Sequence, residues 1–202
     1  MTTAAAIITQ ARRLLADKND LSFEQVDLLA YLNEGCQRFA VETHVCQKIL
    51  AYTATASQLT FDTLSGEDAS IEEVLQVGKV ELVSATGSTF LPFSPMWEKK
   101  TRLAAGTTTP TRYSIFADSI VFDTYSEETL SLPIQVYLTF KPVSVVIDAN
   151  ILIPSEWEEA IVKYVVFCAA LSVRDSGNAA GAFEEYSQLR DTARQAMLAR
   201  TG

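Results

Sequence analysis

Residues 151–173 read ILIPSEWEEAIVKYVVFCAALSV, and they decide the fold because they predict a buried helix after a β-rich region. Ser155 and Glu158 form the capping-box pattern of a helix N-terminus. Five large side chains then recur at intervals of four and three residues and so share one helix face: Trp157, Ile161, Tyr164, Cys168 and Leu171. From residue 164 to 173 only Ser172 is clearly polar, which predicts a helix buried on most of its sides.

Three more helices are predicted from apolar spacing, over about residues 3–16, 23–48 and 180–199. The second begins with a capping-box pattern at Ser22 and Gln25. Its apolar stripe comprises Leu28, Leu32, Cys36, Phe39, Thr43, Cys46 and Leu50. The stripe of the last helix comprises Phe183, Tyr186, Leu189, Ala193 and Met197. The chain therefore begins and ends with a pair of helices.

Between these pairs, residues 52–150 have the composition of strands and turns. The clearest strand covers 134–140, where Ile134, Val136, Leu138 and Phe140 alternate with polar or aromatic residues. Shorter strands are predicted at 79–84 and 119–123, a short helix at 96–104, and an exposed acidic loop at 67–73.

These elements predict an α+β fold with a four-helix bundle-like base and an inserted antiparallel β-sheet lobe. The base comprises residues 1–51 and 151–202, and the lobe residues 52–150. Neither helix pair can hide its apolar faces alone, so the two pairs are expected to pack on each other. The expected core contact joins Trp157, Ile161, Tyr164 and Cys168 to Leu28, Leu32, Cys36 and Phe39.

Composition narrows the function classes. The net charge of −9 argues against tight nucleic-acid binding, which uses a basic surface.

No apolar run reaches the roughly 18 residues that span a bilayer, and the first residues do not read as a signal peptide. The three cysteines, Cys36, Cys46 and Cys168, are all expected inside helices, as buried thiols of a reducing compartment.

No pattern of catalytic or metal-binding residues is found. The single histidine, His44, lies two residues from Cys46, so on a helix the two side chains would face different sides and share no metal. The glycines are dispersed and form no phosphate-binding loop. We therefore expect no enzyme activity, no catalytic residues, no metal and no cofactor.

Four stretches of the chain carry a family pattern: DLLAYLNEGCQRFAVET (27–43), PTRY (110–113) with SIVFD (119–123), QVYLTFKP (135–142) and IPSEWEEAI (153–161). In this order and spacing they resemble the head-to-tail adaptor, or connector, proteins of tailed phages, including the tail tubular protein A type. The resemblance covers about residues 20–190.

The resemblance implies a structural virion protein that forms a ring, usually of twelve copies, below the portal. The ring would join the portal protein to a tail or nozzle protein, and DNA would pass through its lumen without sequence-specific binding. This implies a place in the neck of the virion, and in the host cytoplasm during assembly. An acidic ring suits a lumen that should not retain DNA.

Two alternatives remain open at this point. One is a head-completion or stopper protein of the same neck region. The other, from a different class, is a β-lobed binding module or a hydrolase without a recognised motif.

The last helix is the expected portal-docking element, because it lies at a chain end and mixes apolar with basic groups: Tyr186, Arg190, Arg194 and Met197. A solvated face opposite a core stripe is an equally good interpretation of its arginines. Because like charges repel, we also expect the isolated chain to be monomeric or weakly associated until the portal templates the ring.

Overall fold

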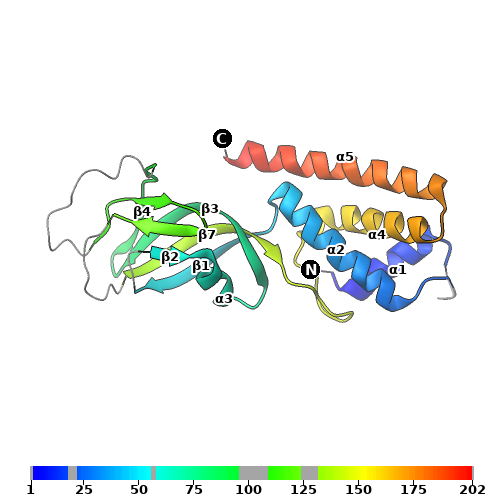
Figure 1. The fold of residues 1–202 in the computed structure, drawn as a ribbon, viewed down its shortest axis with the longest axis horizontal. Coiled ribbons are helices and arrows are strands. Elements are labelled where there is room, and N and C mark those ends of the chain that lie inside the picture. Colours follow the sequence, from blue (N-terminus) through cyan, green and yellow to red (C-terminus); the bar gives the residue numbers. More distant parts are fainter. Residues whose placement is uncertain (1, 18–21, 56–57, 96–108, 124–131, 202) are drawn as a thin grey trace. The chain divides into compact units, whose positions relative to one another are not determined.

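The computed structural model describes residues 2–17, 22–55, 58–95, 109–123 and 132–201. Within these residues the fold is α+β, with five α-helices and two β-sheets (Figure 1). Contacts divide the chain into a helical unit, residues 1–46 with 141–202, and a β unit, residues 47–140. The sequence predicted a β lobe over residues 52–150. In the structure, residues 47–51 belong to the β unit and residues 141–150 to the helical unit.

The helical unit contains α1 (Ala4–Leu14), α2 (Gln25–Thr43), a 3-10 turn η2 (Ser155–Trp157), α4 (Glu158–Ser172) and α5 (Ser176–Thr201). Helix α4 contacts α1, α2 and α5, which suits its almost wholly apolar sequence. Eight of its residues are buried, including Ile161, Tyr164 and Val165. Burial of this helix on several sides follows from the lack of a polar face.

The residues expected to form the core contact are mostly buried in the helical unit. Leu28, Leu32, Cys36, Phe39, Ile161 and Tyr164 are buried, whereas Trp157 and Cys168 are half-buried. The ring centroids of Phe39 and Trp157 lie 6.3 Å apart. Gly35 brings the backbone of α2 close to the Tyr164 ring, because a Cβ built at this glycine would lie 2.7 Å from Tyr164 Cδ1.

Helix α2 ends earlier than the apolar spacing predicts, at Thr43 and not near Lys48. His44 takes the left-handed conformation, with φ of 58°, and its N–H bonds to the Ala40 carbonyl. This arrangement closes a helix C-terminus. Cys46 consequently lies between α2 and the first strand and not inside a helix, although it is buried.

The helix starts also differ from the predicted capping boxes. Helix α4 begins through η2, and neither Pro154 nor Trp157 caps it with a side chain. The N-cap of α2 is Glu24, also without a side-chain bond, while the Ser22 N–H donates to the Asp17 carboxylate. Helix α5 starts at 176, four residues before the predicted 180, because the turn after α4 is short and Arg174 adopts a φ of 61°.

The β unit contains seven strands and one short helix among its described residues. They are β1 (Gln47–Ala54), β2 (Gln58–Thr60), α3 (Phe61–Gly66), β3 (Ile71–Ser84), β4 (Gly87–Leu91), β5 (Tyr113–Ile115), β6 (Ser119–Phe122) and β7 (Leu132–Pro142). One sheet has the order β1-β7-β3-β4 and the other β2-β6-β5. The Ser94 N–H donates to the Tyr113 carbonyl at 2.8 Å, which links the chain after β4 to the second sheet.

Side-chain alternation positions the core of the β unit. In β7 the side chains of Ile134, Val136, Leu138 and Phe140 are buried, as the period of two predicts. The acidic segment 67–73 is only partly a loop, since Ile71 already begins β3, and α3 was not predicted. Asp68 in this segment forms an ion pair with Lys48. The short helix predicted at 96–104 lies outside the described residues.

Candidate functional site

Two buried tyrosines join the helices of the helical unit to carboxylates of α2. The Tyr164 hydroxyl, from α4, donates to Glu34 Oε1 at 2.6 Å, and the Tyr186 hydroxyl, from α5, donates to Glu42 Oε2 at 3.3 Å. The two tyrosine rings meet edge to face, with centroids 5.2 Å apart. Buried hydroxyls that find such acceptors tie three helices together at one place.

Two arginines complete this cluster. Arg38 donates through Nε to Glu42 Oε1 at 2.9 Å, and its guanidinium carbon lies 5.8 Å from the Tyr164 ring centroid. Arg190 places a guanidinium nitrogen 3.6 Å from Glu42 Oε2. Six residues thus form what we term the tyrosine–carboxylate network: Glu34, Arg38, Glu42, Tyr164, Tyr186 and Arg190.

The electrostatics of this network favour a fixed structural role. Burial raises the pKa of Tyr164, and its hydrogen bond to Glu34 raises it further. Burial likewise raises the pKa of Tyr186, with the charge of Glu42 as the next cause. The hydrogen bond to Glu42 raises the pKa of Arg38. Near neutral pH both tyrosines therefore remain protonated donors and Arg38 remains a cation.

The structure separates the four residues expected to dock on the portal. Tyr186 is fully buried and Met197 nearly so, which makes both part of the core of the helical unit. Arg190 is partly exposed and is held by Glu42 and by Asp191, whose Oδ1 lies 2.8 Å away. Of the four, only Arg194 is exposed. A docking surface that uses Tyr186 and Met197 is thus inconsistent with the packing of α5.

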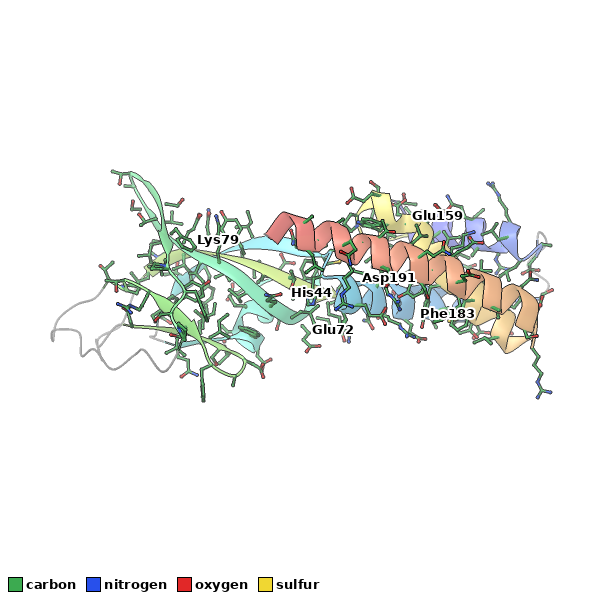
Figure 2. All side chains as sticks on the ribbon, turned by 90° about the horizontal axis from the view of Figure 1, so that it is seen from above. His44, Glu72, Lys79, Glu159, Phe183 and Asp191 are labelled. Carbon is green, nitrogen blue, oxygen red and sulfur yellow. The ribbon has the colours of Figure 1, made fainter. Side chains whose placement is uncertain are left out.

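The exposed side of α5 carries other residues. Phe183 and Asp191 lie about two turns apart along this helix (Figure 2). Phe183 is partly exposed, and its ring packs at a tilt against Phe167 of α4, with centroids 4.9 Å apart. Leu198 is largely exposed, four residues after Arg194. This outward face mixes apolar and basic groups, as the sequence suggested for the helix as a whole.

His44 and the cysteines do not form a reactive cluster. His44 is exposed at the C-cap of α2. Burial raises the pKa of Cys36 and of Cys46 to about 12, and that of Cys168 to about 11, so all three thiols remain protonated near neutral pH. Among the described residues, no group of three or more histidine, cysteine, aspartate or glutamate side chains is arranged to hold a metal ion.

The β unit contributes a second exposed surface, on the outer face of its four-stranded sheet. Ile49 of β1 pairs with Tyr137 of β7, whose hydroxyl donates to Glu81 Oε2 at 3.1 Å, and Glu81 of β3 pairs with Phe90 of β4. We term these four residues the outer-face row. Lys79 lies over the Tyr137 ring, 4.2 Å from its centroid, and forms an ion pair with Glu81 at 2.7 Å.

Sequence reasoning missed both the tyrosine–carboxylate network and the outer-face row. Glu34, Arg38 and Glu42 follow each other at intervals of four residues on a predicted helix, which is a recognisable pattern of neighbours on one face. Their tyrosine partners lie 130 and 144 residues away in the sequence, and no local pattern predicts contacts over such separations. The outer-face row depends on strand register, which a single sequence does not specify.

The described residues thus form an α+β fold with an exposed surface on each unit, along α5 and on the outer face of the four-stranded sheet. The model of the SU10 adaptor protein family matches residues 2–202, so the chain belongs to this family. No curated protein matches the chain. Membership implies a phage adaptor with a structural role, placed in the neck of the virion and in contact with portal and tail components. No described helix is both long enough and apolar enough to cross a membrane.

Proposed function

We propose that this chain forms a ring of twelve copies that joins the portal to the tail and lets DNA pass through its lumen. The observation that carries the proposal is the family match over residues 2–202. The net charge of −9 supports it, because an acidic ring repels the phosphates of passing DNA. We also propose the tail tubular protein A type as its subgroup, and assembly in the host cytoplasm.

In this proposal the chain acts by binding and not by catalysis. The four helices of the helical unit serve as a bundle-like base, held rigid by the tyrosine–carboxylate network. Burial of the cysteines supports this role, because it raises their thiol pKa and so disfavours the nucleophilic thiolate near neutral pH.

Copurification with the portal protein of the same phage, followed by negative-stain imaging and native mass measurement, tests the proposal. We expect a ring of twelve copies on the portal, and a monomeric or weakly associated chain in its absence. A chain that never associates with portal, or that turns over a substrate as a monomer, would contradict the proposal.

The portal contact itself can be tested on α5. Truncation after Gly181 would delete the buried Tyr186, Ala193 and Met197, so it would disturb folding together with docking. Arg194→Glu changes an exposed side chain and should weaken portal binding. Arg13→Glu, the same charge change on the exposed side of α1, is the matched control and should leave binding unchanged.

A further inference from the structure

The four-stranded sheet of the β unit has two edges that no described strand covers along β1 and β4 themselves, and the chain directly after β4 bonds to Tyr113 of β5. Its order, β1-β7-β3-β4, leaves β1 at one edge and β4 at the other. An uncovered edge presents a row of backbone N–H and C=O groups that can pair with another chain. Proteins usually block such edges with charged residues or proline, and β4, whose sequence is GSTFL, contains neither.

The outer-face row places a large apolar side chain at each of these edges. It runs across the sheet from Ile49 through Tyr137 and Glu81 to Phe90, so all four side chains lie on the same face. Ile49 is 52% exposed and Phe90 is 54% exposed, whereas Glu81 between them is almost buried. Each end of the row therefore lacks the neighbour that a further strand would provide.

We infer that the β4 edge of one copy pairs with the β1 edge of the next, so that the sheet continues from subunit to subunit. This inference rests on the proposed ring and names the contact that closes it. In such a continued sheet, Phe90 of one copy and Ile49 of the next lie on adjacent strands and on the same face. Each then covers apolar surface that the other exposes in the single chain.

A second copy of this chain fits these edges for two reasons. The two edges differ, so their pairing is head to tail, and a head-to-tail contact repeated by rotation closes a ring. The contact also brings no acidic residue together, because β4 is uncharged and β1 carries only Lys48. Self-repulsion of the acidic chains is therefore weak along this contact.

A crosslinking experiment on the portal-bound chain tests the inference. A double variant, Ile49→Cys with Phe90→Cys, is treated with a short bifunctional maleimide beside the two single variants and the wild-type chain. The native thiols are the background, with Cys36 and Cys46 buried. We expect a ladder of crosslinked multimers from the double variant, and no crosslinks above the wild-type level from either single variant.

A matched pair of charge substitutions tests the same contact without crosslinking. Phe90→Lys places a charge on the β4 edge and should raise about tenfold the concentration at which half of the portal complexes carry a ring. Phe116→Lys makes the same change at a phenylalanine that is 59% exposed outside the four-stranded sheet, and should have no effect.

The outcomes separate this inference from the proposed function. Rings without a crosslinked ladder, or rings unaffected by Phe90→Lys, would overturn the strand pairing. The proposed function of the ring would then still stand. Dimers from Phe90→Cys alone would indicate β4–β4 pairing and would also overturn it. If the wild-type chain forms no ring with portal, both the strand pairing and the proposed function fail.

Discussion

Substitution of Gly35 by alanine probes the contact between α2 and α4 most directly. A Cβ at this position would lie 2.7 Å from Tyr164 Cδ1 and 3.2 Å from Tyr164 Cγ, closer than carbon atoms pack. The Tyr164 ring has little freedom to retreat, because its hydroxyl is bonded to Glu34 and its ring packs edge to face with Tyr186. The added methyl group must therefore displace a well-packed aromatic ring.

The expected free-energy change combines two opposing effects. Alanine improves the intrinsic helix propensity of α2 by about 1 kcal/mol over glycine. Overpacking of a core typically costs about 1–3 kcal/mol. Because the 2.7 Å approach is to an aromatic ring held on two sides, we place the cost near the upper end. Gly35→Ala should then lower the free energy of unfolding of the helical unit by about 1–2 kcal/mol.

Urea denaturation followed by tryptophan fluorescence measures this change. The chain has two tryptophans, so a Trp97→Phe background leaves Trp157 as the reporter of the helical unit. Gly181→Ala in α5 is the matched control, because no atom lies within 4 Å of its added Cβ. This control should gain about 0.5–1 kcal/mol from helix propensity alone.

Equal stabilisation by Gly35→Ala and Gly181→Ala would refute the close approach of α2 to Tyr164. A double-mutant cycle sharpens the test. In a Tyr164→Leu background the ring is absent, so Gly35→Ala should no longer destabilise and should approach the effect of the Gly181 control.

Three further predictions concern other residues. Phe39→Ala should cost about 3–5 kcal/mol in a denaturation curve because Phe39 is fully buried, while Phe116→Ala, at an exposed ring, should cost little. His44→Gln should leave ring assembly on the portal unchanged, and loss of bound metal or of an activity would contradict this. The Lys48 hydrogen bond, followed by bonds from residue 70, lowers the pKa of Asp68 to about 2. Its stabilising effect is therefore present above the ordinary carboxyl pKa and is lost as the pH falls from about 4 to about 2, and Asp68→Asn should flatten this part of a stability–pH curve.

Periodicity predicted those elements in which one local pattern dominates. The alternation at Ile134, Val136 and Leu138 marks β7 as a strand with one buried face, and the unbroken apolar run after Tyr164 marks α4 as central. Both patterns depend on neighbours within a few residues, which a single sequence contains in full. The α+β class follows from them.

The end of α2 shows where the same reasoning fails. Cys46 and Leu50 continue the helical spacing after Phe39, yet both are buried outside the helix, Leu50 within β1. When a strand follows a helix closely, its buried residues can fall by coincidence at the three- and four-residue intervals of the helix. The helix stops at His44 because that residue adopts a positive φ, and histidine, unlike glycine, gives little indication of this.

The hairpin of β3 and β4 was detectable in part. Gly87, with a φ of 137°, follows Thr86 at the turn, and the β-branched and aromatic residues on both sides favour strands. The exposure of Phe90 was not detectable, because it depends on β4 being at the edge of its sheet. Strand order arises from pairings between distant segments such as β7 with β1.

Helix α5 shows why an apolar stripe does not identify a docking surface. Spacing tells that a face is covered, but it does not tell whether the same chain or a partner covers it. Tyr186 is covered from within, since its ring lies against Phe39 and Tyr164 and its hydroxyl reaches Glu42. A portal contact made by α5 must then use the opposite side of the helix, where the exposed Arg194 and Leu198 lie one turn apart.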